Sequence, residues 1–261
     1  MKKLYLKIFT LLLILSVSVS CAIQNIENDD KAVQNARMAT RSGDGLAWDY
    51  PIKPGSKEWA ALKSGREKVE ACQIPIGILA RLSTKELAEI CMNYPMYFEF
   101  TAYDDEKRAI SRIIERFNGL SELSKRESGT LELINIYRDF PVTAQVQSES
   151  AKNLYTPITI KLPFLELLLA DDAFAKQIDS QMAIELEKIV LDKYVRKLEN
   201  NHIFSLWNIK RTFLLGAVTM NYRNKFLESS MQHDVIKRFI ENYNHLDPTL
   251  ITEVSKIISE I

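Results

Sequence analysis

The chain has 261 residues, with 34 basic residues balanced by 34 acidic ones and 46% hydrophobic residues. This balance excludes a strongly basic protein that binds nucleic acid by bulk electrostatic attraction. With only three cysteines, a small scaffold held by many disulfides is excluded too, and a globular chain of one large or two small domains is favoured.

Residues 1–20 have the pattern of a signal peptide. Basic residues precede residues 8–19, which carry only apolar and hydroxyl side chains. That run is too short to span a bilayer and matches a signal-peptide core. The following Ser18-Val19-Ser20-Cys21 resembles the lipobox of bacterial lipoproteins, with Ser18 where Leu is usual. The resemblance implies that Cys21 carries acyl chains such as palmitate; the alternative is ordinary secretion with a free Cys21 thiol.

Residues 21–55 are predicted to be a lipidated Cys21 followed by a flexible tether. The stretch is rich in Gly, Pro, Asn and Asp and has no apolar periodicity. It would hold a domain off the membrane, with Trp48 and Tyr50 docked onto that domain. Ala22 after the cysteine is not a retention signal, which favours the outer membrane over the inner membrane of the cell envelope.

Residues 56–261 are predicted to form a single all-α domain. Residues 164–261 contain one Gly and one Pro, far fewer turn residues than a strand-rich fold requires. We expect an irregular multi-helix bundle or a short α-α superhelix of roughly eight to ten helices. No clean repeat indicates a regular solenoid.

Helix ends are marked by specific residues. Ser83 and Glu86 have the spacing of a capping box. Asp104 and Asp105 precede an apolar stripe, so they are expected at a helix N-terminus. Gly119 is predicted to end a helix in the left-handed conformation. A further helix start, with an N-cap followed by proline, is predicted at Asp247 and Pro248.

Three other segments carry distinct patterns. In residues 180–200, Ile184, Leu191 and Leu198 share one helical face, opposite a charged face. Residues 203–222 are apolar nearly all round and predict a central helix, whose Lys210 and Arg211 extend toward solvent or pair with acids. Residues 156–162 alternate between apolar and polar, and are expected to be an extended connector.

Cys72 and Cys91 are candidates for a disulfide. They lie near the ends of consecutive predicted helices. In an oxidising compartment a disulfide between them would stabilise the fold by about 3 kcal/mol through loop closure. The alternative is a pair of buried free thiols that pack as small apolar residues. Neither cysteine has a histidine or acid beside it in sequence to indicate catalysis.

Five aromatic residues lie within ten positions and are a candidate ligand platform. Such a group could stack on a sugar or a base, although aromatic groups more often pack in a core. The acids beside them raise a glycan-binding protein or a hydrolase as the alternative function. The five are Tyr94, Tyr97, Phe98, Phe100 and Tyr103.

No established catalytic or cofactor motif occurs in the sequence. His202, His233 and His245 are not at metal-ligand spacing, and there is no phosphate-binding glycine loop or nucleophile elbow. We therefore expect no cofactor and no metal, and a protein that acts by binding rather than by catalysis.

The region from Trp59 to Arg126 resembles an uncharacterised family of Bacteroidetes-type secreted lipoproteins. The resemblance covers about a quarter of the chain, departs at Gly77 where Glu is expected, and implies a compartment but no activity. It is carried by Trp59, Cys72-Gln73-Ile74-Pro75, Ser83-Thr84, Leu87, Cys91, Tyr94-Pro95, Phe117-Asn118-Gly119, Glu122-Leu123 and Arg126. The sequence thus predicts a lipid-anchored envelope protein, a scaffold or accessory subunit with an envelope protein as partner and without nucleic acid.

Overall fold

The structure is a computed structural model that describes residues 48–142, 157–224, 231–245 and 247–259. Cys21 and residues 1–47, which include the predicted signal peptide and most of the predicted tether, lie outside the described residues. Every regular element within the described ranges is a helix, which confirms the predicted all-α, multi-helix fold.

The internal contacts divide the described residues into two units. The smaller contains residues 48–51 and Ile74–Leu82, and the larger contains residues 52–73 and 83–259. In the smaller unit, Trp48 and Tyr50 are buried and meet edge to face, with ring centroids 4.6 Å apart. These two aromatic rings therefore pack against each other at the start of the described chain.

The described residues contain more helices than the eight to ten predicted, because several helices are only one or two turns long. Helix α4 (Ile76–Leu79) belongs to the smaller unit. The larger unit contains α2 (Lys57–Ala61), α3 (Gly65–Ala71), α5 (Thr84–Met92), the 3-10 helix η1 (Tyr97–Ala102), α6 (Glu106–Arg116), α7 (Asn118–Leu123), α8 (Gly129–Asp139), α9 (Pro157–Ala170), α10 (Asp172–Ala175), α11 (Ser180–Glu199), α12 (Leu206–Asn224), α13 (Met231–Glu241) and α14 (Pro248–Ser259).

The predicted helix starts are confirmed. Ser83 and Glu86 form a reciprocal capping box at the start of α5. The Asp105 carboxylate caps α6 by accepting from the backbone N–H of Arg108. At α14, the Asp247 carboxylate accepts from two backbone N–H groups beyond Pro248. Each cap satisfies donors that the first turn leaves without a partner in its own helix.

The predicted helix end at Gly119 is wrong. Gly119 is buried inside α7, and α6 ends three residues earlier at Arg116, followed by Phe117 in an extended conformation. The junction is bridged by Gln73, whose amide oxygen accepts from the backbone N–H of Asn118 at 3.0 Å and whose amide nitrogen donates to the Arg116 carbonyl at 3.1 Å. A side chain 45 residues away in sequence therefore satisfies backbone groups at this helix end, where a glycine was predicted to end the helix.

The prediction of an extended connector at residues 156–162 is also wrong for the residues that the structure describes, because α9 begins at Pro157. Residues 162–170 are all buried, so α9 is apolar on nearly every side. A buried helix and a buried strand have the same hydrophobic pattern over so few residues. Pro157 stands in the first turn, where its missing N–H costs nothing, but Pro163 lies inside the helix.

Helix α11 turns a different face to the core than predicted. Ile184 and Leu198 are more than 40% exposed, whereas Lys193 and Lys197 are buried. The Lys193 ammonium donates to the carbonyls of Arg138 and Phe140, at 2.9 and 2.7 Å, where α8 ends. Partners on other helices keep these lysines in the core, so the hydrophobic pattern of α11 alone indicates the wrong face.

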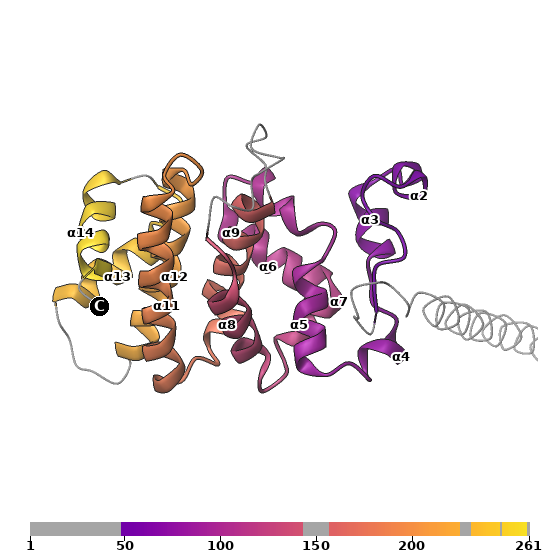
Figure 1. Ribbon diagram of the computed structural model, residues 1–261, viewed down its shortest axis with the longest axis horizontal. Helices are drawn as coiled ribbons and strands as arrows, with labels where there is room; N and C mark the ends of the chain where they lie inside the picture. The colour runs from indigo at the N-terminus through magenta and orange to yellow at the C-terminus, as the bar shows by residue number, and fades with distance from the viewer. Residues whose placement is uncertain (1–47, 143–156, 225–230, 246, 260–261) are drawn as a thin grey trace, which may run out of the picture. The chain divides into compact units, whose positions relative to one another are not determined.

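Helix α12 is the predicted central helix. It packs along α11, and it also contacts α9, α13 and α14 (Figure 1). Most of its middle is buried, including Phe213, Leu214 and Leu215. Because α12 contacts so many helices, polar side chains along it link several elements of the larger unit.

Candidate functional site

A hydrogen-bonded cap ties the start of α12 to α9. The Asn208 side-chain oxygen accepts from the backbone N–H and the hydroxyl of Ser205, at 3.1 and 2.9 Å. The Asn208 side-chain nitrogen donates to the Thr159 carbonyl at 3.1 Å. In a regular helix that carbonyl would receive the N–H of residue 163, but Pro163 has none. The cap therefore holds α12 beside the proline turn of α9.

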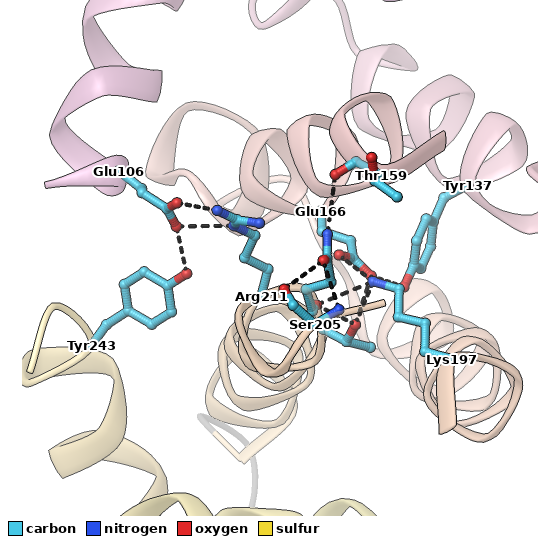
Figure 2. Close-up of polar contacts among 10 residues, drawn as sticks. Glu106, Tyr137, Thr159, Glu166, Lys197, Ser205, Arg211 and Tyr243 are labelled. Carbon is cyan, nitrogen blue, oxygen red and sulfur yellow. Dashed lines mark hydrogen bonds and ion pairs between the residues drawn. The ribbon is translucent and has the colours of Figure 1, made fainter. Parts of the chain in front are cut away.

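A buried ion pair lies further along the same contact. The Lys197 ammonium lies 2.8 Å from each oxygen of Glu166, and neither side chain is exposed. The hydroxyls of Tyr137 and Thr212 both donate to Glu166 at 2.9 Å (Figure 2). Burial lowers the pKa of Lys197 and raises that of Tyr137. This network joins α8, α9, α11 and α12.

A second polar cluster lies on another face of α12. The Arg211 guanidinium forms a two-point ion pair with Glu106 of α6, one contact of which is an Nε–Oε2 hydrogen bond of 3.1 Å. The Tyr243 hydroxyl donates to the same carboxylate at 2.9 Å (Figure 2). The prediction that Arg211 pairs with an acid is confirmed. Burial raises the pKa of Tyr243, so its hydroxyl remains a donor.

This second cluster forms one wall of a cavity of about 400 Å³. The volume is within the range of pockets that bind small ligands. Two aromatic residues at the cavity are only partly covered: Tyr103 is 42% exposed and Trp207 is 46% exposed. The α12 pocket, as we name it, is lined by Tyr103, Asp104, Glu106, Trp207, Lys210, Arg211, Tyr243 and Asn244.

Lys210 is the unusual member of the α12 pocket. The residue is 1% exposed, and its ammonium lies 4.2 Å from the ring centroid of Tyr243 and 4.9 Å from that of Trp207. Among the described residues it has no hydrogen-bond acceptor and no ion-pair partner. Burial lowers its pKa, and the nearby Glu106 carboxylate opposes this shift. Two ring faces stabilise the cation, but they do not replace three N–H acceptors.

The five predicted platform aromatics do not share one surface. Tyr94 is buried and stacks on Phe117 at 4.2 Å, and Phe100 is buried beside Phe164. The remaining three differ in exposure: Tyr97 is partly buried under Lys161, Phe98 is exposed, and Tyr103 lines the α12 pocket. One member of the predicted platform is therefore at the cavity, and two belong to the core.

Both described cysteines are buried and carry free thiols. Cys72 ends α3, and burial together with the nearby Glu99 raises its pKa to about 12. Burial likewise raises the pKa of Cys91 in α5. Because the thiolate is the reactive form, neither sulfur is suited to nucleophilic chemistry near neutral pH.

The histidines do not gather at a site. His202 and His245 are exposed, and the side chain of His233 lies outside the described ones. No group of three or more His, Cys, Asp or Glu residues suited to a metal ion occurs in the described ranges. Within the same ranges, no helix is both long enough and apolar enough to cross a membrane.

The sequence pattern predicts Trp207, Lys210 and Arg211 only as parts of a central helix. It does not place them at a pocket. The sequence pattern assigns no role to Tyr243, whose ring lies beside the Lys210 ammonium. One signal was present: two adjacent cations in the middle of an otherwise apolar helix require partners. The sequence does not show that only Arg211 has one.

No family model, no curated protein and no solved structure matches the chain.

Proposed function

We propose that this chain is a lipid-anchored cell-envelope protein that binds a small anionic ligand in the α12 pocket. One observation carries the ligand part of the proposal: Lys210 brings a buried ammonium to a cavity and has no protein acceptor there. Buried ammonium groups are normally paired or hydrogen-bonded. An anionic group on a ligand would supply the missing acceptors.

The other cation of the α12 pocket is already paired, which leaves the Lys210 ammonium to bind a ligand. Arg211 is already occupied by Glu106, so it positions the pocket wall. A larger cavity, of about 680 Å³, has no buried cation among the residues that line it. Of the two cations that line it, Arg138 is paired with Glu185 at 2.6 Å and also donates to Asn135, and Lys85 is exposed to solvent. Lys210 is therefore the cation best placed to receive an anion.

Native mass spectrometry tests the ligand part. Wild-type protein taken from its own envelope in mild detergent should retain an anionic small molecule that is lost on collisional activation. Lys210→Met should carry no such molecule. Lys161→Met is a matched control, because Lys161 also lies over a tyrosine ring, 5.6 Å from Tyr97, but does not line the pocket. An apo mass for all three proteins would contradict the proposal.

The anchor part is supported by the signal-like residues 1–20 and by the lipobox resemblance that ends at Cys21. Two or more acyl chains hold a protein stably at a membrane, whereas one chain does not. Cys21→Ala should therefore move the protein from the membrane fraction to the soluble fraction while its far-ultraviolet circular dichroism stays unchanged. A variant that remains in the membrane fraction would contradict the anchor.

The scaffold or accessory role, with an envelope protein as partner, remains part of the proposal. It is supported by the predicted location and by the helical fold of the described residues. In-cell crosslinking of the tagged protein at native abundance, followed by mass spectrometry, should recover one or two stoichiometric envelope proteins. Recovery of the chain alone would contradict a protein partner and leave the ligand part in place.

A further inference from the structure

The α12 pocket combines three kinds of group that are each incompletely satisfied by the protein. Lys210 offers an ammonium without an acceptor. Tyr103 and Trp207 offer partly exposed rings. Asp104 is exposed at the pocket and makes no hydrogen bond within the described ranges. A ligand that brings an anion, a flat apolar face and hydrogen-bond donors would match all three groups.

We propose that the α12 pocket binds an acidic sugar, a hexuronate whose carboxylate contacts Lys210, whose ring packs on Trp207 and Tyr103, and whose hydroxyl groups donate to Asp104. This inference rests on the proposed anion-binding function and names its ligand class. It concerns the sugar residue, whether free or at the end of a glycan chain.

Each part of a hexuronate matches one part of the pocket. The C–H face of a pyranose is weakly positive and packs against the negative face of an aromatic ring. The ring carboxylate is a charged acceptor, which forms the stronger kind of hydrogen bond with an ammonium. The sugar hydroxyls are donors, and the Asp104 carboxylate oxygens can accept from them.

Other ligand classes satisfy fewer of these groups. A neutral sugar would leave the Lys210 ammonium without an anion. An aromatic carboxylate would pair with Lys210 and stack, but it has no hydroxyl donors for Asp104. The exposed carboxylate of Asp104 would also repel a compact multivalent anion such as phosphate, whereas the single charge of a hexuronate can lie at the Lys210 end.

Isothermal titration of the full-length protein in nonionic detergent tests the inference with three probes: glucuronate, glucose and benzoate. Glucuronate should bind at least about tenfold more tightly than either of the others, since each supplies only part of the contacts. Equal affinity for glucuronate and glucose would overturn the role of Lys210. Equal affinity for glucuronate and benzoate would overturn the sugar class.

Variants separate the contacts. Lys210→Met should weaken glucuronate binding about tenfold or more, and Trp207→Ala should weaken it as well, while Lys161→Met should leave it unchanged. Asp104→Ala is the variant that should leave folding undisturbed, because this side chain is exposed. It should weaken glucuronate binding and spare benzoate binding. Equal loss for both probes, or no loss for either, would overturn the hydroxyl contact.

The outcomes also separate this inference from the proposed function. If benzoate binds through Lys210 and glucuronate does not, the anion-binding function stands and the hexuronate inference fails. If none of the three probes binds at millimolar concentration, the hexuronate inference fails. A small anion retained by wild type and lost in Lys210→Met would then still support the proposed function.

Discussion

The ammonium of Lys197 contacts both carboxylate oxygens of Glu166 at 2.8 Å, and neither side chain is exposed to solvent. The pair joins α11 to α9, and Thr212 of α12 bonds to both of its members. Both charges have several hydrogen-bond partners, as a buried pair requires. We therefore interpret this network as the feature that fixes α12, which carries Trp207, Lys210 and Arg211 of the pocket, against α8, α9 and α11.

The Glu166–Lys197 pair predicts an asymmetry between single and double variants. Glu166→Gln should lower the free energy of unfolding by about 3–5 kcal/mol, because the Lys197 charge is left buried without its counter-charge. The double variant Glu166→Leu with Lys197→Met should lose less than this single variant, since no charge remains to be desolvated. Urea unfolding followed by circular dichroism measures both. A double variant that loses as much stability as Glu166→Gln, or more, would contradict this prediction.

The Asn208 cap predicts a coupling with Pro163. Asn208→Ala should cost about 1–2 kcal/mol, because it removes the donor to Thr159 and the acceptor for Ser205. In a Pro163→Ala background the cost should fall by about 0.5–1 kcal/mol, since the restored N–H can bond to the Thr159 carbonyl. Loss of the Ser205 contacts is common to both backgrounds, so the cycle isolates this one bond. A coupling of zero would contradict the account of the proline turn.

Two glycines in equivalent helix positions should respond differently to alanine. Gly129 and Gly65 each begin a helix, α8 and α3. A Cβ at Gly129 would collide with the Leu123 carbonyl, whereas the nearest atom to a Cβ at Gly65 is 3.9 Å away. Gly129→Ala should lower the unfolding free energy by about 2 kcal/mol, as overpacking does, while Gly65→Ala should be neutral or slightly stabilising. Equal thermal midpoints for the two variants would be inconsistent with this packing.

The fold class and most helix starts could be predicted because their signals are local. Ser83, Asp105 and Asp247 cap helices through contacts no more than three residues away, and a sequence pattern records such spacing. The all-α class follows from a shortage of turn residues over a long stretch.

Most of the errors arise from partners that are distant in sequence. The core face of α11 was misjudged because Lys197 is stabilised by Glu166, 31 residues away. The beginning of α9 has a different cause: residues 156–162 alternate between apolar and polar, and so short a pattern does not separate a helix from an extended segment. The α12 pocket joins Tyr103, Trp207 and Tyr243, and no local spacing predicts that these three meet.

The thiols of Cys72 and Cys91 give a prediction that also decides between the two alternatives raised by the sequence. Both are buried with raised pKa values, so iodoacetamide at pH 8 should label neither in the native protein. In guanidinium without reductant it should label both, because unfolding exposes free thiols and restores an ordinary pKa. Peptide mass spectrometry reads the result. Labelling that requires a reductant would instead establish a disulfide.

The accessibility of Trp207 to ions tests the central claim, that the α12 pocket receives anions through Lys210. Quenching of fluorescence by iodide and by caesium is compared at constant low ionic strength, and Trp207→Phe supplies the background of Trp48 and Trp59. We predict that iodide quenches Trp207 more strongly than caesium does, and that Lys210→Met abolishes this preference while Lys161→Met retains it. Equal quenching by the two ions, or an iodide preference that survives in Lys210→Met, would contradict the claim.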